Sequence, residues 1–442
     1  MAFETERSRV AHLLRRAGFG SNEAELDEYT ALGFAGTLDR LLNYEQVDDS
    51  AVEQQIASIQ IDRRNVEAAR FAWLTRMLYT RRPLQEKMVL FWHTHFATAA
   101  SKVRSADLML QQMQLFRDNA LGNFETLLQR VTRDSAMLIW LDNNQNRAGK
   151  PNENYAREVM ELFTVGIGNY TDADVKEAAR AFTGYGADRA GQFVFNPDQH
   201  DDGDKTFMGV TRNWDADDVL ATLVRHPATA RFLTTKLFRF FVFEIPDAST
   251  VDRLASLYTD SGFDMRAVVR DILSGPEFLS PLAYHAQVKQ PADLVVGALK
   301  ALNVQNIGPD LPQATRRMGQ DLLNPPDVSG WKGGDNWISA TTLLERFNFA
   351  DRLAATRGAD QPYFVDIGSQ LQGHGLRGAS DVVDYYLALL VDGAATPEAR
   401  QSLIDYLNAD GGFAVAAGDE SVEQKVRGML HIAMSLPTHQ LA

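Results

Sequence analysis

Three segments far apart in the chain carry side chains that can bind a metal or move protons. The first segment holds His93 and His95, flanked by aromatic residues. Neutral imidazole is a common ligand of transition metals, so this pair is a candidate metal site. On a regular helix the two side chains point about 200° apart, and they share a face only if the helix ends or distorts there. The alternative is one packed core histidine and one exposed histidine.

The second segment covers residues 152–162. On a helix, Asn154, Glu158 and Glu161 line one face and Arg157 lies on the adjoining face. Two carboxylates three residues apart can bind a cation between helices. The alternative is a surface helix in which Arg157 forms ion pairs worth about a few tenths of a kcal/mol each. The apolar residues Val159, Met160, Leu162 and Phe163 leave little of the helix to face water, which favours a metal or a buried polar network.

The third segment, residues 200–206, has the composition of a hairpin turn. Asp202 followed by Gly203 is a strong turn signal, and His200, Asp201 and Lys205 lie around it. Such a tip is either a solvent-exposed turn or a segment that places a histidine or a lysine over the mouth of a pocket.

These segments lead to the hypothesis of a metal-dependent enzyme, hydrolytic or oxidative, with its site between helices. Without cysteine, the ligand types suit Zn²⁺, Mn²⁺, Fe or Mg²⁺. The alternative function is a non-enzymatic scaffold or accessory protein whose buried polar network is structural. In the enzyme hypothesis the metal ligands are His93, His95, Glu158, Glu161 and His200, the catalytic residues are Glu158, Arg157, His200, Asp201 and Lys205, and Asn154 and Trp331 bind the substrate.

The sequence lacks the strong reaction motifs. It has no phosphate-binding loop, no nucleophile elbow and no His-Glu-x-x-His pair. The absence of cysteine excludes disulfides and Cys-ligated zinc or iron–sulfur sites. Residues 198–209 resemble a calcium loop only superficially, because Gly209 stands where the bidentate glutamate is needed. The net charge of −14 argues against a nucleic-acid partner.

Helical periodicity dominates the chain and predicts an all-α fold with a small β-hairpin inserted near 191–210. We expect a main helical domain over 1–355, with the hairpin insertion at 187–214, and a smaller helical unit over 356–442. No segment is apolar enough to span a membrane, and the N-terminus lacks a signal peptide, so the cytoplasm is the default expectation. Helices are predicted at 70–80, 107–118, 123–139, 153–165, 172–183, 217–223, 228–242, 250–259, 264–273, 291–302, 339–356, 380–391 and 396–407.

Six segments, in this order along the chain, resemble the motifs of a bacterial family called domain of unknown function 1800. They are Ala-His-Leu-Leu-Arg-Arg-Ala-Gly-Phe-Gly (11–20), Phe-Trp-His-Thr-His-Phe (91–96), Asn-Glu-Asn-Tyr-Ala-Arg-Glu-Val-Met-Glu-Leu (152–162), His-Asp-Asp-Gly-Asp-Lys-Thr (200–206), Asn-Pro-Pro-Asp-Val-Ser-Gly-Trp (324–331) and Ser-Leu-Pro-Thr-His-Gln-Leu-Ala (435–442). The resemblance implies a helical fold and a bacterial origin, but no reaction. It also implies a protein partner, because genes of the family often neighbour those of a sulfatase-like family. The chain departs from the pattern at Phe163, where relatives commonly have histidine, and this weakens any role for that histidine as an essential ligand.

Overall fold

The computed structural model describes residues 3–442 except 63, 189, 410, 417 and 418. In this part of the chain it has 22 α-helices and four short β-strands, which confirms the predicted all-α class with a small β insertion. Up to the insertion the helices are α1 (Glu6–Arg16), α2 (Glu23–Leu42), α3 (Ser50–Ala57), α4 (Val66–Tyr79), α5 (Pro83–His95), α6 (Ala100–Val103), α7 (Ala106–Asp118), α8 (Phe124–Thr132), α9 (Ser135–Trp140), α10 (Asn154–Glu161) and α11 (Asp172–Ala181). After it come α12 (Ala216–Arg225), α13 (Pro227–Phe241), α14 (Ala248–Asp260), α15 (Met265–Ser274), α16 (Pro291–Ala301), α17 (Leu311–Arg317), α18 (Ala340–Ala355), α19 (Ile367–Gly373), α20 (Ala379–Val391), α21 (Pro397–Asn408) and α22 (Glu420–Ser435).

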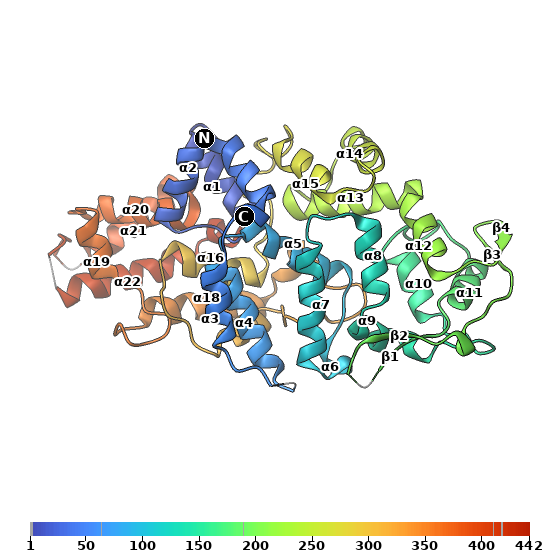
Figure 1. Ribbon diagram of the computed structural model, residues 1–442. Coiled ribbons are helices and arrows are strands. Elements are labelled where there is room, and N and C mark those ends of the chain that lie inside the picture. The colour runs from blue at the N-terminus through green and yellow to red at the C-terminus, as the bar shows by residue number, and fades with distance from the viewer. Residues whose placement is uncertain (1–2, 63, 189, 410, 417–418) are drawn as a thin grey trace.

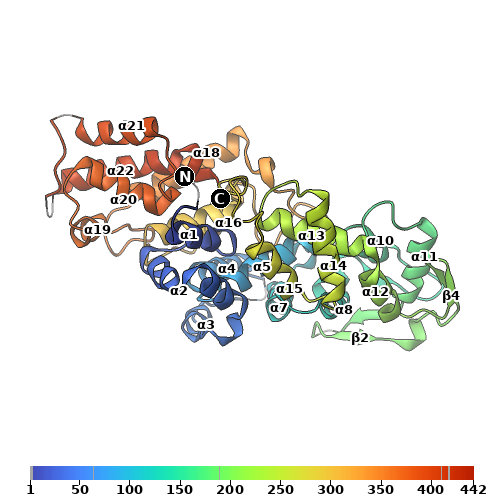
Figure 2. The ribbon, with the colours of Figure 1, turned by 90° about the horizontal axis from the view of Figure 1, so that it is seen from above.

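The molecule is elongated. Helices α19 to α22 lie at one end, and α10 to α12 with the strands lie at the other (Figures 1 and 2). Helices α1 to α5 and α16 fill the middle, and both views place the N-terminus and the C-terminus close to each other there. One hydrophobic cluster runs through the described chain from Val10 to Met434, and α18 packs against α22. The division into units 1–355 and 356–442 stays a prediction.

The helix ends follow local capping chemistry. Thr5 and Asn22 each close a capping box at the start of α1 and α2, which satisfies backbone N–H groups that have no partner inside the helix. Pro291 opens α16, and Thr396 caps α21 with proline at its first position, as the sequence predicts. The helix expected at 123–139 is two helices instead. The Asp134 side chain accepts a hydrogen bond from the Met137 N–H and begins α9 as a separate helix.

The β insertion consists of two hairpins. Strand β1 (Tyr185–Ala187) pairs antiparallel with β2 (Phe193–Phe195), and β3 (Lys205–Phe207) pairs with β4 (Val210–Arg212). The turn between β3 and β4 is Met208-Gly209, and both residues have positive φ, as a tight hairpin turn requires. The prediction of a hairpin turn at Asp202-Gly203 is wrong, because this dipeptide lies in the segment between the two hairpins. None of the described helices is long and apolar enough to cross a membrane.

Helices α4, α5 and α7 are joined by a buried ion pair. The Glu86 carboxylate, 1% exposed, accepts hydrogen bonds from Arg117 Nε at 2.5 Å and Nη2 at 3.0 Å, and from Trp73 Nε1 at 3.1 Å. A buried charge that loses its partner is costly, because neither water nor another group replaces the lost bonds.

Replacing Glu86 by alanine is therefore expected to lower the free energy of unfolding by about 3 kcal/mol. The matched control is Glu45→Ala, because Glu45 pairs with Arg266 while its side chain is 53% exposed. An exposed pair of this kind is worth about 0–1 kcal/mol. Urea unfolding of the two variants measures the difference, and equal losses would contradict a structural role for Glu86.

Candidate functional site

The two histidines of α5 lie in different surroundings. His93 is fully buried with its ring edge-on to Trp73 and Trp331, each at 5.5 Å between ring centroids. Neither of its ring nitrogens has a hydrogen-bond partner in the described part of the chain. Burial and the nearby Arg70 lower the pKa of His93 to about 3, so the ring is neutral.

His95, the last residue of α5, is held by two bonds. Its Nε2 donates to the Phe163 carbonyl at 3.1 Å, and its Nδ1 accepts from the Lys236 ammonium at 3.3 Å. Lys236 also donates to the Leu162 carbonyl at 3.2 Å. Burial and the Lys236 charge lower the pKa of His95 well below its ordinary value. His95 thus fixes the end of α5 against the end of α10.

The loop that carries Trp331 packs directly on α5. A Cβ atom at Gly330 would lie 2.3 Å from the Thr94 carbonyl oxygen, and Gly330 has a φ of +78°. Only glycine allows this approach, which seats the Trp331 ring against His93. The structure therefore brings Trp331 and His93 together, as elements of one packed core.

The predicted carboxylates of α10 lie near the surface. Glu161 accepts a hydrogen bond from the Tyr170 hydroxyl at 2.6 Å. Glu158 is half-buried, and its carboxylate forms no hydrogen bond or ion pair with another described residue. Burial and the neighbouring Glu161 raise the pKa of Glu158. Arg157 bonds to Asp172 at 3.2 Å and approaches Glu153 at 3.7 Å, and Asn154 is exposed.

The third predicted group is tied to α11 and to the hairpins. Asp201 receives two hydrogen bonds from Arg180, at 2.7 and 3.0 Å, and Arg180 lowers the pKa of this carboxyl group. His200 Nδ1 donates to the Thr183 carbonyl at 2.9 Å. Lys205 is buried and donates to the Gly203 carbonyl and to Asn213 at 2.9 and 3.0 Å. These contacts fasten the start of the second hairpin to the helical body.

The three groups keep separate partners. Among the described residues, no set of three or more His, Asp or Glu side chains is placed to hold a metal ion. The predicted convergence of His93, His95, Glu158, Glu161 and His200 on one ion therefore has no support from the described geometry. The metal-dependent reaction stays a prediction.

A pocket that the sequence analysis missed lies where the two ends of the chain meet. We call it the terminal pocket and define it by Arg15 of α1, Lys289 and Asp293 at the start of α16, Asp392 after α20, and His439 near the C-terminus. Its volume is about 50 Å³, room for about two water molecules. Apolar side chains complete the wall, including Phe19, Leu26 and Leu390. A polar cavity with a partly apolar wall is the usual form of a small-molecule site.

Lys289 is the unusual member of the terminal pocket. Its side chain is buried, and its ammonium group forms no hydrogen bond or ion pair with any described residue. Burial and the Arg15 charge lower its pKa to about 7, while Asp392 and Asp293 act in the opposite direction. The backbone at this residue is fixed, because its N–H donates to Gln440 and its carbonyl accepts from Arg346.

The neighbours of Lys289 also have unused bonding capacity. Buried Arg15 Nε and His439 Nδ1 have no hydrogen-bond partner among the described residues, and the same is true of both ring nitrogens of His285. Burial lowers the pKa of His285 to about 3, with a further contribution from Arg15. The Arg15 Nη1 group pairs with Asp392 and its Nη2 lies 3.3 Å from His12. Buried polar atoms without partners are rare in folded proteins, and two residues that line the terminal pocket, Arg15 and His439, each carry one.

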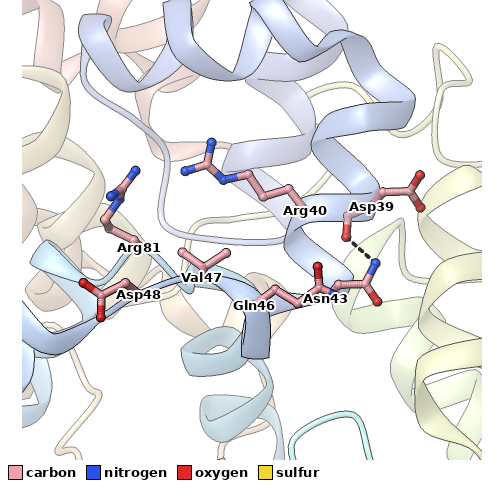
Figure 3. Close-up of a pocket in the computed structure, with 7 residues that line it drawn as sticks. All are labelled: Asp39, Arg40, Asn43, Gln46, Val47, Asp48 and Arg81. Carbon is pink, nitrogen blue, oxygen red and sulfur yellow. Dashed lines mark hydrogen bonds between the residues drawn. The ribbon is translucent and has the colours of Figure 1, made fainter.

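A larger cleft of about 460 Å³ lies on the surface and is lined by residues from the end of α2, the segment that follows it, and Arg81 before α5 (Figure 3). Its charged groups already have partners. Arg40 and Arg81 bond to Glu28 at 2.7 and 3.4 Å, and Asp39 bonds to Arg270 at 2.5 Å. This cleft offers fewer unmet bonds than the terminal pocket despite its size.

The signal for the terminal pocket was present in the sequence but spread over three distant segments. Residues 11–20 and 435–442 both belong to the motifs that carry the family resemblance, and Lys289 directly precedes the segment that opens α16. None of these segments alone matches a known reaction motif. Only the fold brings them together.

Comparison with known proteins yields one match. The model of a family described as "Protein of unknown function (DUF1800)" matches residues 12–441. No functionally curated protein and no solved structure matches the chain.

The unpaired state of His93 leads to a test. Replacing His93 by leucine should raise the free energy of unfolding by about 1 kcal/mol, because an unpaired buried polar group is removed. The matched control, His95→Leu, should lower it by about 2 kcal/mol, because the bonds to Phe163 and Lys236 are lost. Chemical unfolding gives both values. Metal analysis of the wild type and of His93→Leu, both purified without chelator, completes the test. Stoichiometric metal in the wild type that is lost in the variant would show that His93 is not an unpaired core residue and would support the metal hypothesis.

Proposed function

The chain belongs to the DUF1800 family of proteins of unknown function, and we propose that it binds a small organic acid in the terminal pocket. The observation that carries the proposal is the ammonium of the largely buried Lys289 side chain, which lines a cavity and has no partner among the described residues. An unpaired buried cation is unfavourable, and a bound anion would offset this cost.

The composition of the pocket indicates the kind of anion. Lys289 lines the pocket, and its ammonium can donate to a carboxylate. Phe19, Leu26 and Leu390 provide apolar surface for a short carbon chain. A volume of about 50 Å³ restricts the ligand to the smallest carboxylates. A short-chain carboxylate meets all three conditions.

The position of the pocket supports a binding role. It lies between α1, α16 and α20, and α20 belongs to the smaller unit predicted over 356–442. Ligand sites are common where two such units meet. The metal-dependent enzyme and the scaffold function both stay predictions from the sequence, and binding in the terminal pocket rests on different residues from either.

Propionate is the probe for this proposal. Isothermal titration calorimetry should detect its binding to the wild type, and Lys289→Met should weaken binding by about tenfold or more, because one charge-assisted contact is worth about 1.5–3 kcal/mol. The matched control is Lys150→Met, since Lys150 is exposed and lies outside the pocket. Unchanged affinity in Lys289→Met, or no binding to the wild type, would contradict the proposal.

The same titration should depend on pH. The pKa of Lys289 is about 7 in the folded protein, against an ordinary value of 10.5. Propionate affinity should therefore fall as the pH rises from about 6 to about 9, because the ammonium loses its proton. The free energy of unfolding should rise with pH above pH 7, because the unfolded chain still binds the proton that the folded chain releases. Both trends should be smaller in Lys289→Met.

A further inference from the structure

Lys289 has the features of a nucleophilic amine as well as those of an anion-binding group. We propose that the acid bound in the terminal pocket is a 2-oxo acid, and that Lys289 forms a reversible imine with its carbonyl carbon. This inference rests on the proposed function, since the acid must first bind in the pocket.

The other buried lysines show how unusual Lys289 is. Lys87 donates two hydrogen bonds to Asp293, both at 2.7 Å, and Lys300 donates two to Glu25, at 2.8 and 3.0 Å. Lys205 donates to Gly203 and Asn213. Each of these ammonium groups is hydrogen-bonded to acceptors that stabilise its positive charge. Among the buried lysines of the described chain, Lys289 alone has an amine without such a bond.

The surroundings of Lys289 favour the neutral amine, which is the nucleophilic form. The charges of Arg15, Asp392, Asp293 and Arg346 all affect the pKa of Lys289. Burial and the Arg15 charge lower this pKa by more than the two carboxylates raise it. His439 and His285 remain neutral because burial lowers the pKa of both rings. A substantial fraction of Lys289 is therefore unprotonated at neutral pH, unlike an ordinary surface lysine.

The reaction balances without a further reactant. The lone pair of the Lys289 nitrogen attacks the carbonyl carbon, and a C–N bond forms while the carbonyl π bond opens. Both hydrogens of the neutral amine leave with the carbonyl oxygen as one water molecule, and a C=N bond remains. Asp293 and Asp392 line the same cavity, and a carboxylate there can move a proton from nitrogen to oxygen. Hydrolysis by one water molecule reverses the sequence.

The size of the pocket restricts the ligand. A volume of about 50 Å³ favours the smallest 2-oxo acid, glyoxylate, whose carbonyl group is directly bonded to the carboxylate. A longer chain would have to displace Phe19 or Leu390 from the wall.

Reductive trapping tests the inference on the full-length protein. The wild type is incubated with glyoxylate and sodium borohydride, digested, and mapped by mass spectrometry. We expect one carboxymethyl group on the peptide that contains Lys289 and none on the peptide that contains Lys300, which serves as the internal control. Lys289→Arg keeps the positive charge and should lose the adduct. Thermal unfolding of that variant shows whether it is folded, and the wild-type map supports or rejects the inference even if it is not.

The outcomes separate this inference from the proposed function. Propionate has no ketone or aldehyde carbonyl, so it should bind and compete with glyoxylate but leave no adduct. If propionate binds and glyoxylate is not trapped at Lys289, the imine is wrong and the binding function stands. If propionate does not bind, the proposed function is wrong. An adduct spread over several exposed lysines would show only nonspecific chemistry and would overturn the inference.

Discussion

The buried guanidinium of Arg16 holds together three parts of the chain that are distant in sequence. Its Nε donates to the Phe241 carbonyl at 2.9 Å, its Nη2 to Val242 at 3.0 Å, and its Nη1 to Ala442 at 3.1 Å. Arg16 ends α1, Phe241 ends α13, and Ala442 lies at the C-terminal end. The bonds to Phe241 and Val242 satisfy carbonyl groups at the end of α13, which have no partner inside the helix. The planar fork of arginine allows one side chain to do this in several directions.

The terminal pocket depends on this junction. The segment at 440–442 pairs with residues 287–289, through bonds of 2.8 Å from Lys289 N–H to Gln440 and from Ala442 N–H to Gln287. Arg346 of α18 donates to the Lys289 carbonyl at 2.7 Å and to the Gln440 side chain at 3.3 Å. Lys289 is thus fixed on its backbone from two sides while its amine stays without a partner. A rigid backbone under an unpaired side chain is the arrangement of a preorganised site.

The sequence predicted the helices better than it predicted the site, for a physical reason. Capping residues and proline act within one turn, so α16 and α21 could be located from Pro291 and Thr396. Periodicity also located most helices from α4 to α21, but α1, α2, α3, α6, α17, α19 and α22 were not predicted, although α1 has a local capping box at Thr5. A metal site, by contrast, requires side chains from distant segments to converge, and spacing within each segment carries no information about that. His93 and His95 illustrate the point, since their neighbours are Trp331 in one case and Lys236 in the other.

Buried polar groups were expected to mark the functional site, and the structure shows that bonding state is the better criterion. His95, Asp201 and Lys205 all have close partners, and each connects two elements of the fold. His439, Arg15 and Lys289 each retain an atom without a partner and line one cavity. A polar network whose hydrogen bonds are all formed stabilises a particular packing. Polar groups without partners around a cavity destabilise the folded state, and a bound ligand can remove this destabilisation. His93 has unmet atoms as well, but two indole rings pack against it and it lines neither the terminal pocket nor the larger surface cleft. Lys289 differs from His93, because its unbonded amine belongs to a residue that lines an open volume.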